Sequence, residues 1–298
     1  MNMKLKELFF LHFLNDGFRT IYILILPFIA KDLVLNYTQA GLLGSILNLI
    51  AGLLAIPAGF TASKIGGYKM LISLLAIYSL GTLSIGFSPN LTILTLAYLL
   101  GALGFGMFHT TSFIMVAKLS DKKNIGRNLG EYTSVGEIGR IALPPLAVFA
   151  VSLIGWRTTM LTAAFLGFLT FIVFRFLIPK KDIYHLETDA EKKENHKDFA
   201  KQLINLFKIK KTILAVIAAI IDSFASTPVY IYLPFLVLAK GFNPIELGVI
   251  SAGLFTGSLS GKIILGRISD KLGNTKVFII SELLMAIVLV LITFFPLL

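Results

Sequence analysis

The sequence predicts an all-α integral membrane protein, with a six-helix N-terminal bundle followed by an incomplete second half of three helices. Hydrophobic residues make up 56% of the 298 residues, charged residues make up 14%, and the mean hydropathy is +0.85. The apolar residues come in blocks long enough to cross a bilayer. The chain also repeats itself at an offset of 207 residues. We therefore divide it into a bundle at 1–178, a linker at 179–211 and a partial bundle at 212–298.

Nine apolar segments are candidate membrane spans. The first follows two lysines and is too long for a signal peptide core, so we interpret it as a retained helix. The predicted spans are 8–30, 40–62, 69–88, 92–117, 128–153, 156–178, 212–238, 246–266 and 276–297.

The basic residues define an orientation for these spans. With the N-terminus inside, the inner segments hold 20 of the 27 Lys and Arg residues, and the outer loops hold 3. This asymmetry follows the positive-inside rule, so we expect a multi-pass plasma-membrane protein with a cytoplasmic N-terminus. The net charge of +11 is then a topology signal, and we expect no nucleic-acid partner.

The linker at 179–211 is strongly charged, with nine lysines and six acids, and we expect it to be cytoplasmic. In its second part Phe199, Leu203, Leu206 and Phe207 share one helical face, with lysines around them. That pattern indicates a short helix on the inner membrane surface, although a solvated linker fits equally well.

The repeat is clearest in two glycine-containing turns. Leu26-Pro27-Phe28 aligns with Leu233-Pro234-Phe235, and matching turns follow each copy. In each turn we expect the first glycine to allow close helix packing and the second to adopt a positive φ. The cations should hold the turn on the inner side, and the acid of the second turn can cap or pair with a helix end. The residues concerned are Gly59, Lys64, Gly66 and Lys69 in the first turn, and Gly266, Asp270, Lys271 and Gly273 in the second.

Both turns resemble the signature loop of the major facilitator superfamily, which occurs in each half of those transporters. The second turn has Asp270, whereas the first has Ser63 where the family usually has aspartate. The first span, His12-Phe-Leu-Asn15-Asp16, and the fourth, Gly104-Phe-Gly106-Met-Phe-His109, resemble the fosmidomycin-resistance type of efflux protein. In the fourth span Thr110 stands where that branch usually has proline.

The resemblance and the repeat together imply a two-halved secondary transporter. They also imply that the second half is cut short after its third helix, the ninth of the chain. We therefore expect that the native gene continues, that a second chain completes the bundle, or that the product does not transport.

Ionisable side chains inside spans are costly and indicate function. Span one carries four polar residues on one helical face, and three other spans carry charged or histidine side chains at similar depth. The resemblance implies that helices one, four and seven line the central cavity. The candidate substrate and proton pathway is His12, Asn15, Asp16, Arg19, His109, Glu137, Arg140, Asp222, Ser226 and Tyr230.

A structural role for these charges is the alternative. Asp16 with Arg19, and Glu137 with Arg140, can each pair within one helix. Lys262 lies near the inner end of its span, where we expect it to extend toward the interface. The glycines of span five resemble a superfamily antiporter motif, and helix packing through small residues explains them as well.

The expected chemistry is proton-coupled transport. Asp16, Glu137 and Asp222 are candidate proton carriers, the two histidines titrate near neutrality, and Arg19 and Arg140 can bind an anionic group. We predict export of a small organic molecule or drug, with import of a sugar or organic acid by the same fold as the alternative. A truncated, non-transporting membrane protein is a third possibility. No enzyme, metal or cofactor motif occurs, so we expect no cofactor and no ATP-driven chemistry.

Overall fold

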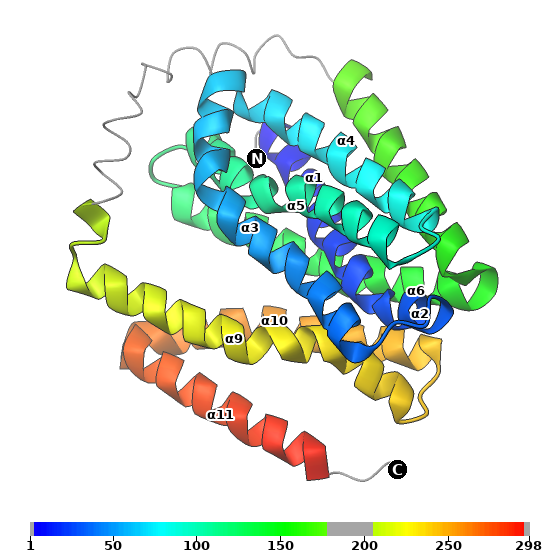
Figure 1. Cartoon of the computed structure of the whole chain (residues 1–298). Coiled ribbons are helices and arrows are strands. Elements are labelled where there is room, and N and C mark those ends of the chain that lie inside the picture. The colour runs from blue at the N-terminus through cyan, green and yellow to red at the C-terminus, as the bar shows by residue number, and fades with distance from the viewer. Residues whose placement is uncertain (1–2, 178–204, 295–298) are drawn as a thin grey trace.

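The computed structural model describes residues 3–177 and 205–294, and these ranges form helices joined by short loops, without strands. Figure 1 shows most of the N-terminal helices packed as one bundle, with the last three helices on one side of it. The elements are α1 (Met3–Leu24), α2 (Leu26–Asp32), α3 (Tyr37–Ile65), α4 (Gly67–Gly86), α5 (Leu91–Leu119), α6 (Ile125–Ile172), the π-helical η1 (Val173–Leu177), α9 (Lys210–Ala239), α10 (Pro244–Leu272) and α11 (Asn274–Phe294).

Eight helical segments of the described ranges are long and apolar enough to cross a membrane. One of them, Ile125–Phe176, has 52 residues, more than twice the length of about 20 residues that a bilayer requires. It contains two helices that meet at Gly155, where φ is +75° and the backbone is not helical. Counting these two separately gives the nine predicted spans, with the fifth and sixth divided where the sequence placed the break.

The first span is interrupted near its C-terminal end. Helix α1 ends at Leu24 and α2 begins at Leu26, with Pro27 in its first turn. Proline has no N–H for the helical hydrogen-bond ladder and favours the first turn of a new helix. The predicted span 8–30 is therefore one crossing made of two helical pieces, Leu5–Asp32.

The two repeated turns have the same backbone geometry. Gly66 ends α3 with a φ of 89°, and Gly273 ends α10 with a φ of 85°. Both values lie in the region that favours glycine, which confirms the predicted role of the second glycine in each turn. The Asp270 carboxylate forms no ion pair or hydrogen bond within the described ranges, so the predicted capping or pairing is not seen there.

The predicted packing role of the first glycine in each turn is wrong. A Cβ on Gly59 would lie 3.7 Å from its nearest neighbour, an ordinary contact, and one on Gly266 would have no neighbour within 4 Å. The close approach falls instead on Gly67, where a Cβ would meet the Met115 sulfur at 2.4 Å. In the first turn, the close contact is thus made by the glycine that begins α4, against α5.

A second pair of features also recurs at the offset of 207 residues. Asn36 caps α3 and exchanges hydrogen bonds with Gln39, and Asn243 caps α10 and exchanges hydrogen bonds with Glu246. Each is a complete capping box, in which two otherwise unpaired backbone N–H groups are satisfied. The repeat therefore fixes the start of each of these helices as well as its end.

The bundle core contains four fully buried tyrosines, Tyr22, Tyr78, Tyr98 and Tyr132. The Tyr22 hydroxyl lies 3.0 Å from the Thr82 hydroxyl, and the Tyr98 hydroxyl donates to the Tyr22 carbonyl at 2.8 Å. Helices α4 and α5 approach closely beside them, because a Cβ on Gly81 would lie 2.5 Å from the Gly101 backbone. Small residues at such crossings allow helices to pack by backbone contact.

Helix α6 packs against α1 in the same way. A Cβ on Gly139 would lie 2.1 Å from the Phe13 carbonyl oxygen, and one on Gly136 would lie 2.4 Å from the His12 ring. These two glycines therefore serve helix packing, the alternative to an antiporter motif. The contact brings the polar face of α1 against α6.

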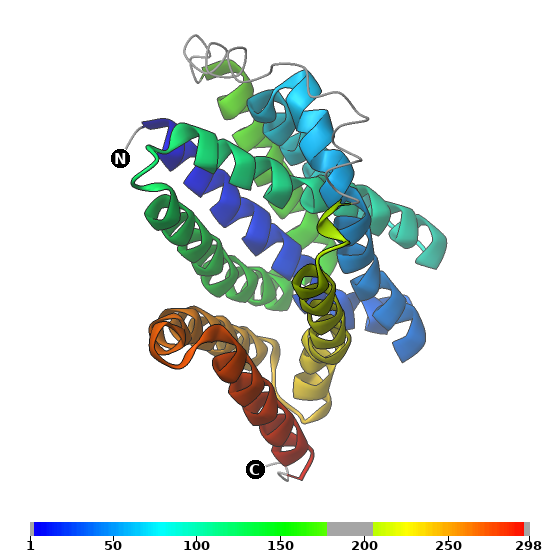
Figure 2. The same ribbon diagram turned by 90° about the vertical axis from the view of Figure 1, so that its left-hand side faces the viewer.

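Helices α9 and α10 pack on the open side of this bundle (Figure 2). Ile231 of α9 fits against Gly44 of α3, and the Tyr232 hydroxyl donates to the Tyr37 carbonyl at 3.0 Å. On the other flank Gly248 of α10 contacts Pro145 of α6, with a Cβ position 3.2 Å from the proline. Two helices of the second repeat are thus held against the first.

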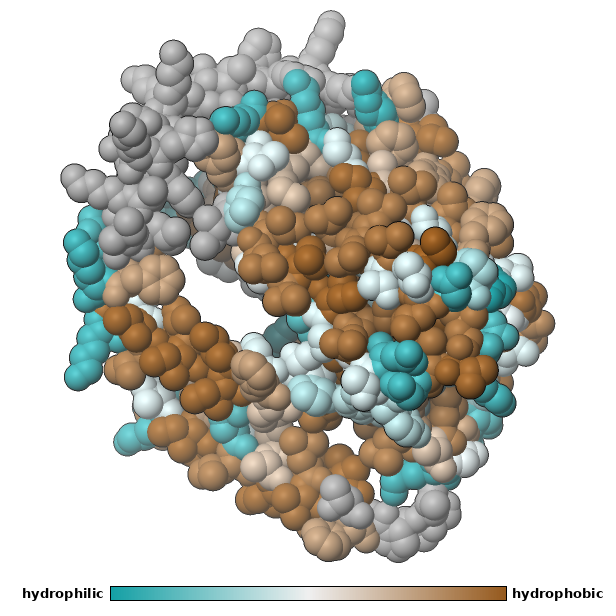
Figure 3. Space-filling view, viewed as in Figure 1, coloured by the Kyte–Doolittle hydropathy of each residue, from teal (hydrophilic) through white to brown (hydrophobic). Residues whose placement is uncertain are grey.

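The outer surface is strongly apolar. Figure 3 shows apolar side chains covering most of one face of the molecule. Many apolar side chains in the first half of α9 and along α11 are exposed, among them Phe224 at 80% and Leu283 at 60%. Such a surface is expected of helices that contact lipid. Of the predicted surface helix, Phe199 and Leu203 lie outside the described residues, and Leu206 and Phe207 are each 50% exposed.

Candidate functional site

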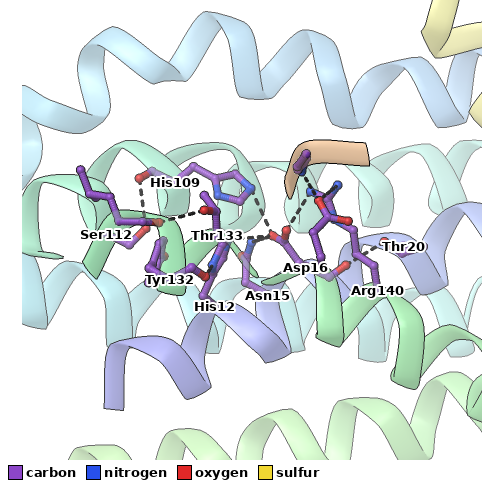
Figure 4. Close-up of polar contacts among 12 residues, drawn as sticks. His12, Asn15, Asp16, Thr20, His109, Ser112, Tyr132, Thr133 and Arg140 are labelled. Carbon is purple, nitrogen blue, oxygen red and sulfur yellow. Dashed lines mark hydrogen bonds and ion pairs between the residues drawn. The ribbon is translucent and has the colours of Figure 1, made fainter. Parts of the chain in front are cut away.

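The Asp16 carboxylate is the centre of a buried polar cluster (Figure 4). Its Oδ1 atom lies 3.4 Å from His12 Nε2, 3.3 Å from His109 Nε2 and 3.1 Å from Asn15 Nδ2. Its Oδ2 atom accepts from Arg140 Nη2 at 2.7 Å. Asp16 is only 3% exposed, so these contacts on α1, α5 and α6 replace the water that a carboxylate needs.

The orientation of the His12 ring follows from its second contact. His12 Nδ1 lies 2.8 Å from the Tyr132 backbone carbonyl, which can only accept a hydrogen bond. Nδ1 must therefore carry a hydrogen, and the Nε2 atom faces the Asp16 carboxylate. The His12 ring stacks on the Tyr132 ring, with the ring centroids 4.0 Å apart. Gly136 leaves room for it, because a Cβ there would lie 2.4 Å from the ring.

Glu137 is a second acidic centre, one turn from Arg140 on α6. Its Oε1 atom accepts from Arg140 Nη1 at 3.3 Å and from the Lys262 ammonium of α10. Glu137 is 2% exposed, and its Oε2 atom is buried without a hydrogen-bond partner. Arg140 thus bridges Asp16 and Glu137, and Lys262 ties this network to the second repeat.

These contacts settle the pairings that the sequence left open. The predicted pair of Glu137 with Arg140 within α6 is present. The predicted pair of Asp16 with Arg19 is wrong, because Asp16 turns to Arg140 on another helix. The expectation that Lys262 extends toward the interface is also wrong, because Glu137 holds its ammonium group.

Arg19 contacts a neutral partner. Its Nη2 atom donates to the Asn48 side-chain oxygen on α3, and its Nε atom is buried without a partner. Within the described residues no carboxylate lies within 4.0 Å of its guanidinium group. The charge is therefore less compensated than that of Arg140.

A cavity of about 240 Å³ lies beside these arginines and is lined by residues of α1, α3, α6, α9 and α10. Several of its lining residues are pairs related by the 207-residue offset. These pairs are Arg19 with Ser226, Thr20 with Thr227, Ile23 with Tyr230 and Asn48 with Phe255. The cavity therefore lies at the junction of the two repeats, where secondary transporters bind their substrates.

Nine of the ten predicted pathway residues lie in the cluster or the cavity, which contains Ser226 and Tyr230. Asp222 is the exception. It forms no ion pair in the part of the chain that the structure describes, and its carboxyl interacts with that of Glu282 on α11.

Four residues of the cluster and the cavity are not among the residues predicted from the sequence: Asn48, Tyr132, Phe255 and Lys262. An intramembrane lysine is itself a functional signal, so Lys262 could have been found. The offset relates Asn48 to Phe255, but it gives no sign that either faces a cavity. Tyr132 acts through its ring and its backbone carbonyl, which no side-chain pattern reveals.

One group of side chains has the spacing of a metal site. His12, Asp16 and His109 place one ligand atom each within 4.8 Å of one another. Arg140 is fixed on the same carboxylate, and its charge opposes a divalent cation there. The arrangement favours a proton in this position, and the absence of a resident metal stays a prediction.

A multi-helix membrane bundle with a polar cavity between two repeats defines the class of secondary transporters. The family profile of the Major Facilitator Superfamily matches residues 8–298, and the chain belongs to this superfamily.

Relatives in this superfamily differ in what their names record. The chain is 24% identical to the sialic acid transporter NanX of Escherichia coli over 281 residues, which cover 93% of this chain and 67% of NanX. It is 27% identical to the quinolone resistance protein NorA of Staphylococcus aureus over 186 residues, or 61% of this chain and 47% of NorA.

A solved structure supports the same fold. The chain is similar to a bacterial homologue of the human lysosomal transporter Spinster in an inward-facing, unoccupied conformation, with a TM-score of 0.73 and 18% identity. The match covers 90% of this chain and 62% of that protein. The chain therefore spans roughly half to two thirds of the length of these three proteins.

Proposed function

We propose that this protein is a proton-coupled secondary transporter that exports a small organic molecule from the cell. The observation that carries the coupling is the His12–Asp16 contact. Because Nδ1 of His12 carries a hydrogen, its Nε2 atom and the Asp16 carboxylate attract each other only when a proton lies on one of them. His109 meets the same carboxylate oxygen and offers a route for that proton.

The network gives the proton a structural consequence. Arg140 is shared between Asp16 and Glu137, and Glu137 also holds Lys262 of α10. A change of charge at Asp16 alters the balance of these contacts, and the chain reaches from α1 through α6 to the second repeat. Proton binding can thereby bias the rocking of one repeat against the other around the cavity.

Export is supported by the motifs of spans one and four, which resemble the fosmidomycin-resistance type, and by similarity to a quinolone resistance protein. Import of an organic acid is a second candidate. The match that covers 93% of the chain is with a sialic acid transporter, and two arginines line the cavity. Both functions use the same fold and the same site.

Asp222 is a further proton carrier in this proposal. It is the repeat counterpart of Asn15 and lies on the helix that brings Ser226 and Tyr230 to the cavity. Its carboxyl group interacts with that of Glu282 on α11, so a second pair of carboxyl groups lies within the predicted spans. Asp222→Asn should therefore reduce proton-coupled transport.

We further propose a plasma-membrane location with the N-terminus in the cytoplasm. Because the chain has no cysteine, single cysteines report topology without background. In intact cells Pro89→Cys should react with a membrane-impermeant thiol reagent, and Ala190→Cys should react only after lysis. The reverse pattern would contradict this orientation.

Transport is tested with purified protein in liposomes that contain a pH-sensitive dye. Sialic acid and a quinolone are added in turn from either side, without and with an imposed pH gradient. We expect one of them, or a molecule of the same class, to move protons in the wild type and not in Asp16→Asn. Glu131→Gln, which alters an exposed ion pair with Arg127, is the control and should transport normally. If none of the added solutes changes the movement of protons, the result would support a non-transporting membrane protein instead.

A further inference from the structure

Arg19 is a partly buried cation that forms no ion pair with a carboxylate among the described residues, and it lines the cavity. It contacts Asn48, a neutral amide, and its Nε donor is buried without a partner. Charged groups removed from water are normally paired, because an uncompensated charge is costly in a low-dielectric site. The structure therefore leaves a place for a negative group at this arginine.

The neighbouring acids are already engaged. Asp16 accepts from Arg140, and Glu137 accepts from Arg140 and Lys262. If the histidines are neutral, the two carboxylates are outnumbered by three cations, Arg19, Arg140 and Lys262. The group of five side chains then carries one net positive charge. A proton on the cluster would increase that excess and favour anion binding, so this charge balance supports the second candidate function, uptake of an organic acid together with a proton.

The rest of the cavity has a different chemistry. Tyr230 of α9 and Phe255 of α10 are stacked with centroids 6.4 Å apart, and both rings line the cavity. Hydroxyl groups surround them, from Thr20, Ser226, Thr227 and Ser251. A volume of about 240 Å³ equals that of about eight water molecules at roughly 30 Å³ each, and suits a molecule of on the order of ten non-hydrogen atoms.

We propose that Arg19 is the carboxylate-binding residue of this cavity, and that the substrate is a small organic monocarboxylate with a planar or apolar body. The carboxylate accepts from the free edge of the Arg19 guanidinium group, and the body lies between this arginine and the two aromatic rings. The inference rests on the proposed transport function and names the substrate class of the same site.

The test uses thermal unfolding of the purified full chain in detergent. The probes are matched pairs of an acid and its neutral amide, benzoate with benzamide and cyclohexanecarboxylate with cyclohexanecarboxamide. We expect at least one acid to raise the melting temperature with saturation, and its amide to have no such effect. In Arg19→Gln the acid should bind roughly 10- to 100-fold more weakly, the loss expected for a hydrogen bond to a charged group.

Arg19→Lys and the unliganded variants provide independent readouts. Arg19→Lys should keep part of the acid-dependent shift, because it keeps the charge. Arg19→Gln without ligand should melt at or above the wild-type temperature, because it removes an unmatched charge, whereas Arg140→Gln should melt lower, because it strips two carboxylates of a partner. The proposal is overturned if acids and amides act alike, if no acid shifts the wild type, or if Arg19→Gln keeps the full shift.

The liposome assay separates this inference from the transport proposal. Suppose that an acid raises the melting temperature only when Arg19 is present, but no solute drives proton movement. This result would support the carboxylate site and contradict the transport function. Proton-coupled movement of a neutral or cationic solute that does not respond to Arg19→Gln keeps the transport function and overturns the carboxylate site.

Discussion

The ion pair between Glu137 and Lys262 joins the two repeats, and its two partners should differ in importance. Glu137 is 2% exposed and contacts both Arg140 and Lys262, whereas the Lys262 side chain is 56% exposed. Lys262→Met leaves Glu137 with Arg140 at 3.3 Å. We therefore expect the free energy of unfolding to fall by about 1 kcal/mol, as for a partly solvated ion pair. Glu137→Gln leaves Lys262 without an anion and weakens the hold on Arg140, and should cost about 3 kcal/mol.

The double variant should cost little more than Glu137→Gln alone, which gives a coupling energy of about 1 kcal/mol. Unfolding of the purified chain in mixed micelles, followed by circular dichroism, measures all three variants. Lys271→Met is the control, because this exposed lysine of α10 has no ion pair within the described ranges, and it should be neutral. Equal losses for the two single variants, or strictly additive losses in the double variant, would refute the proposed network.

Three further outcomes are expected. Gly139→Ala should destabilise the chain by about 1–3 kcal/mol relative to Gly130→Ala, because its Cβ would lie 2.1 Å from a backbone oxygen of α1, whereas the control position is open; melting temperatures measured at one scan rate decide this. Gly273→Ala should cost about 1 kcal/mol or more because φ is 85°, and chymotrypsin should cleave this turn faster if the reasoning holds. ¹⁵N-histidine spectra, assigned with His12→Gln, should show a hydrogen on Nδ1 of His12, and its absence there would contradict the contact with the Tyr132 carbonyl.

Several features of the fold follow from the sequence because they depend on short-range physics. Apolar block length sets the number of crossings, and the division at Gly155 follows from a glycine between two such blocks. The positive φ values of Gly66 and Gly273 follow from a chain reversal that only glycine adopts without strain. The shared face of His12, Asn15 and Asp16 follows from the helical period, and the structure brings that face to α5 and α6.

The pairing of charges could not be predicted in the same way. Asp16 and Arg19 are close along α1, yet the rotation of α6 brings Arg140 nearer, and that rotation depends on glycine contacts such as Gly139 with Phe13. The distance between Asp222 and the cluster likewise depends on how the second repeat packs.

The central claim is that the buried cluster around Asp16 couples a proton to solute movement. The most direct test compares Asp16→Asn with wild type in two liposome assays, accumulation driven by a pH gradient and exchange of labelled for unlabelled solute without a gradient. The solute is the acid that gives the largest thermal shift. We predict that Asp16→Asn loses accumulation driven by the pH gradient and keeps the exchange of labelled for unlabelled solute. The reason is that the variant lacks the proton site, whereas the cavity and Arg19 are intact. Accumulation at the wild-type rate in Asp16→Asn would contradict it.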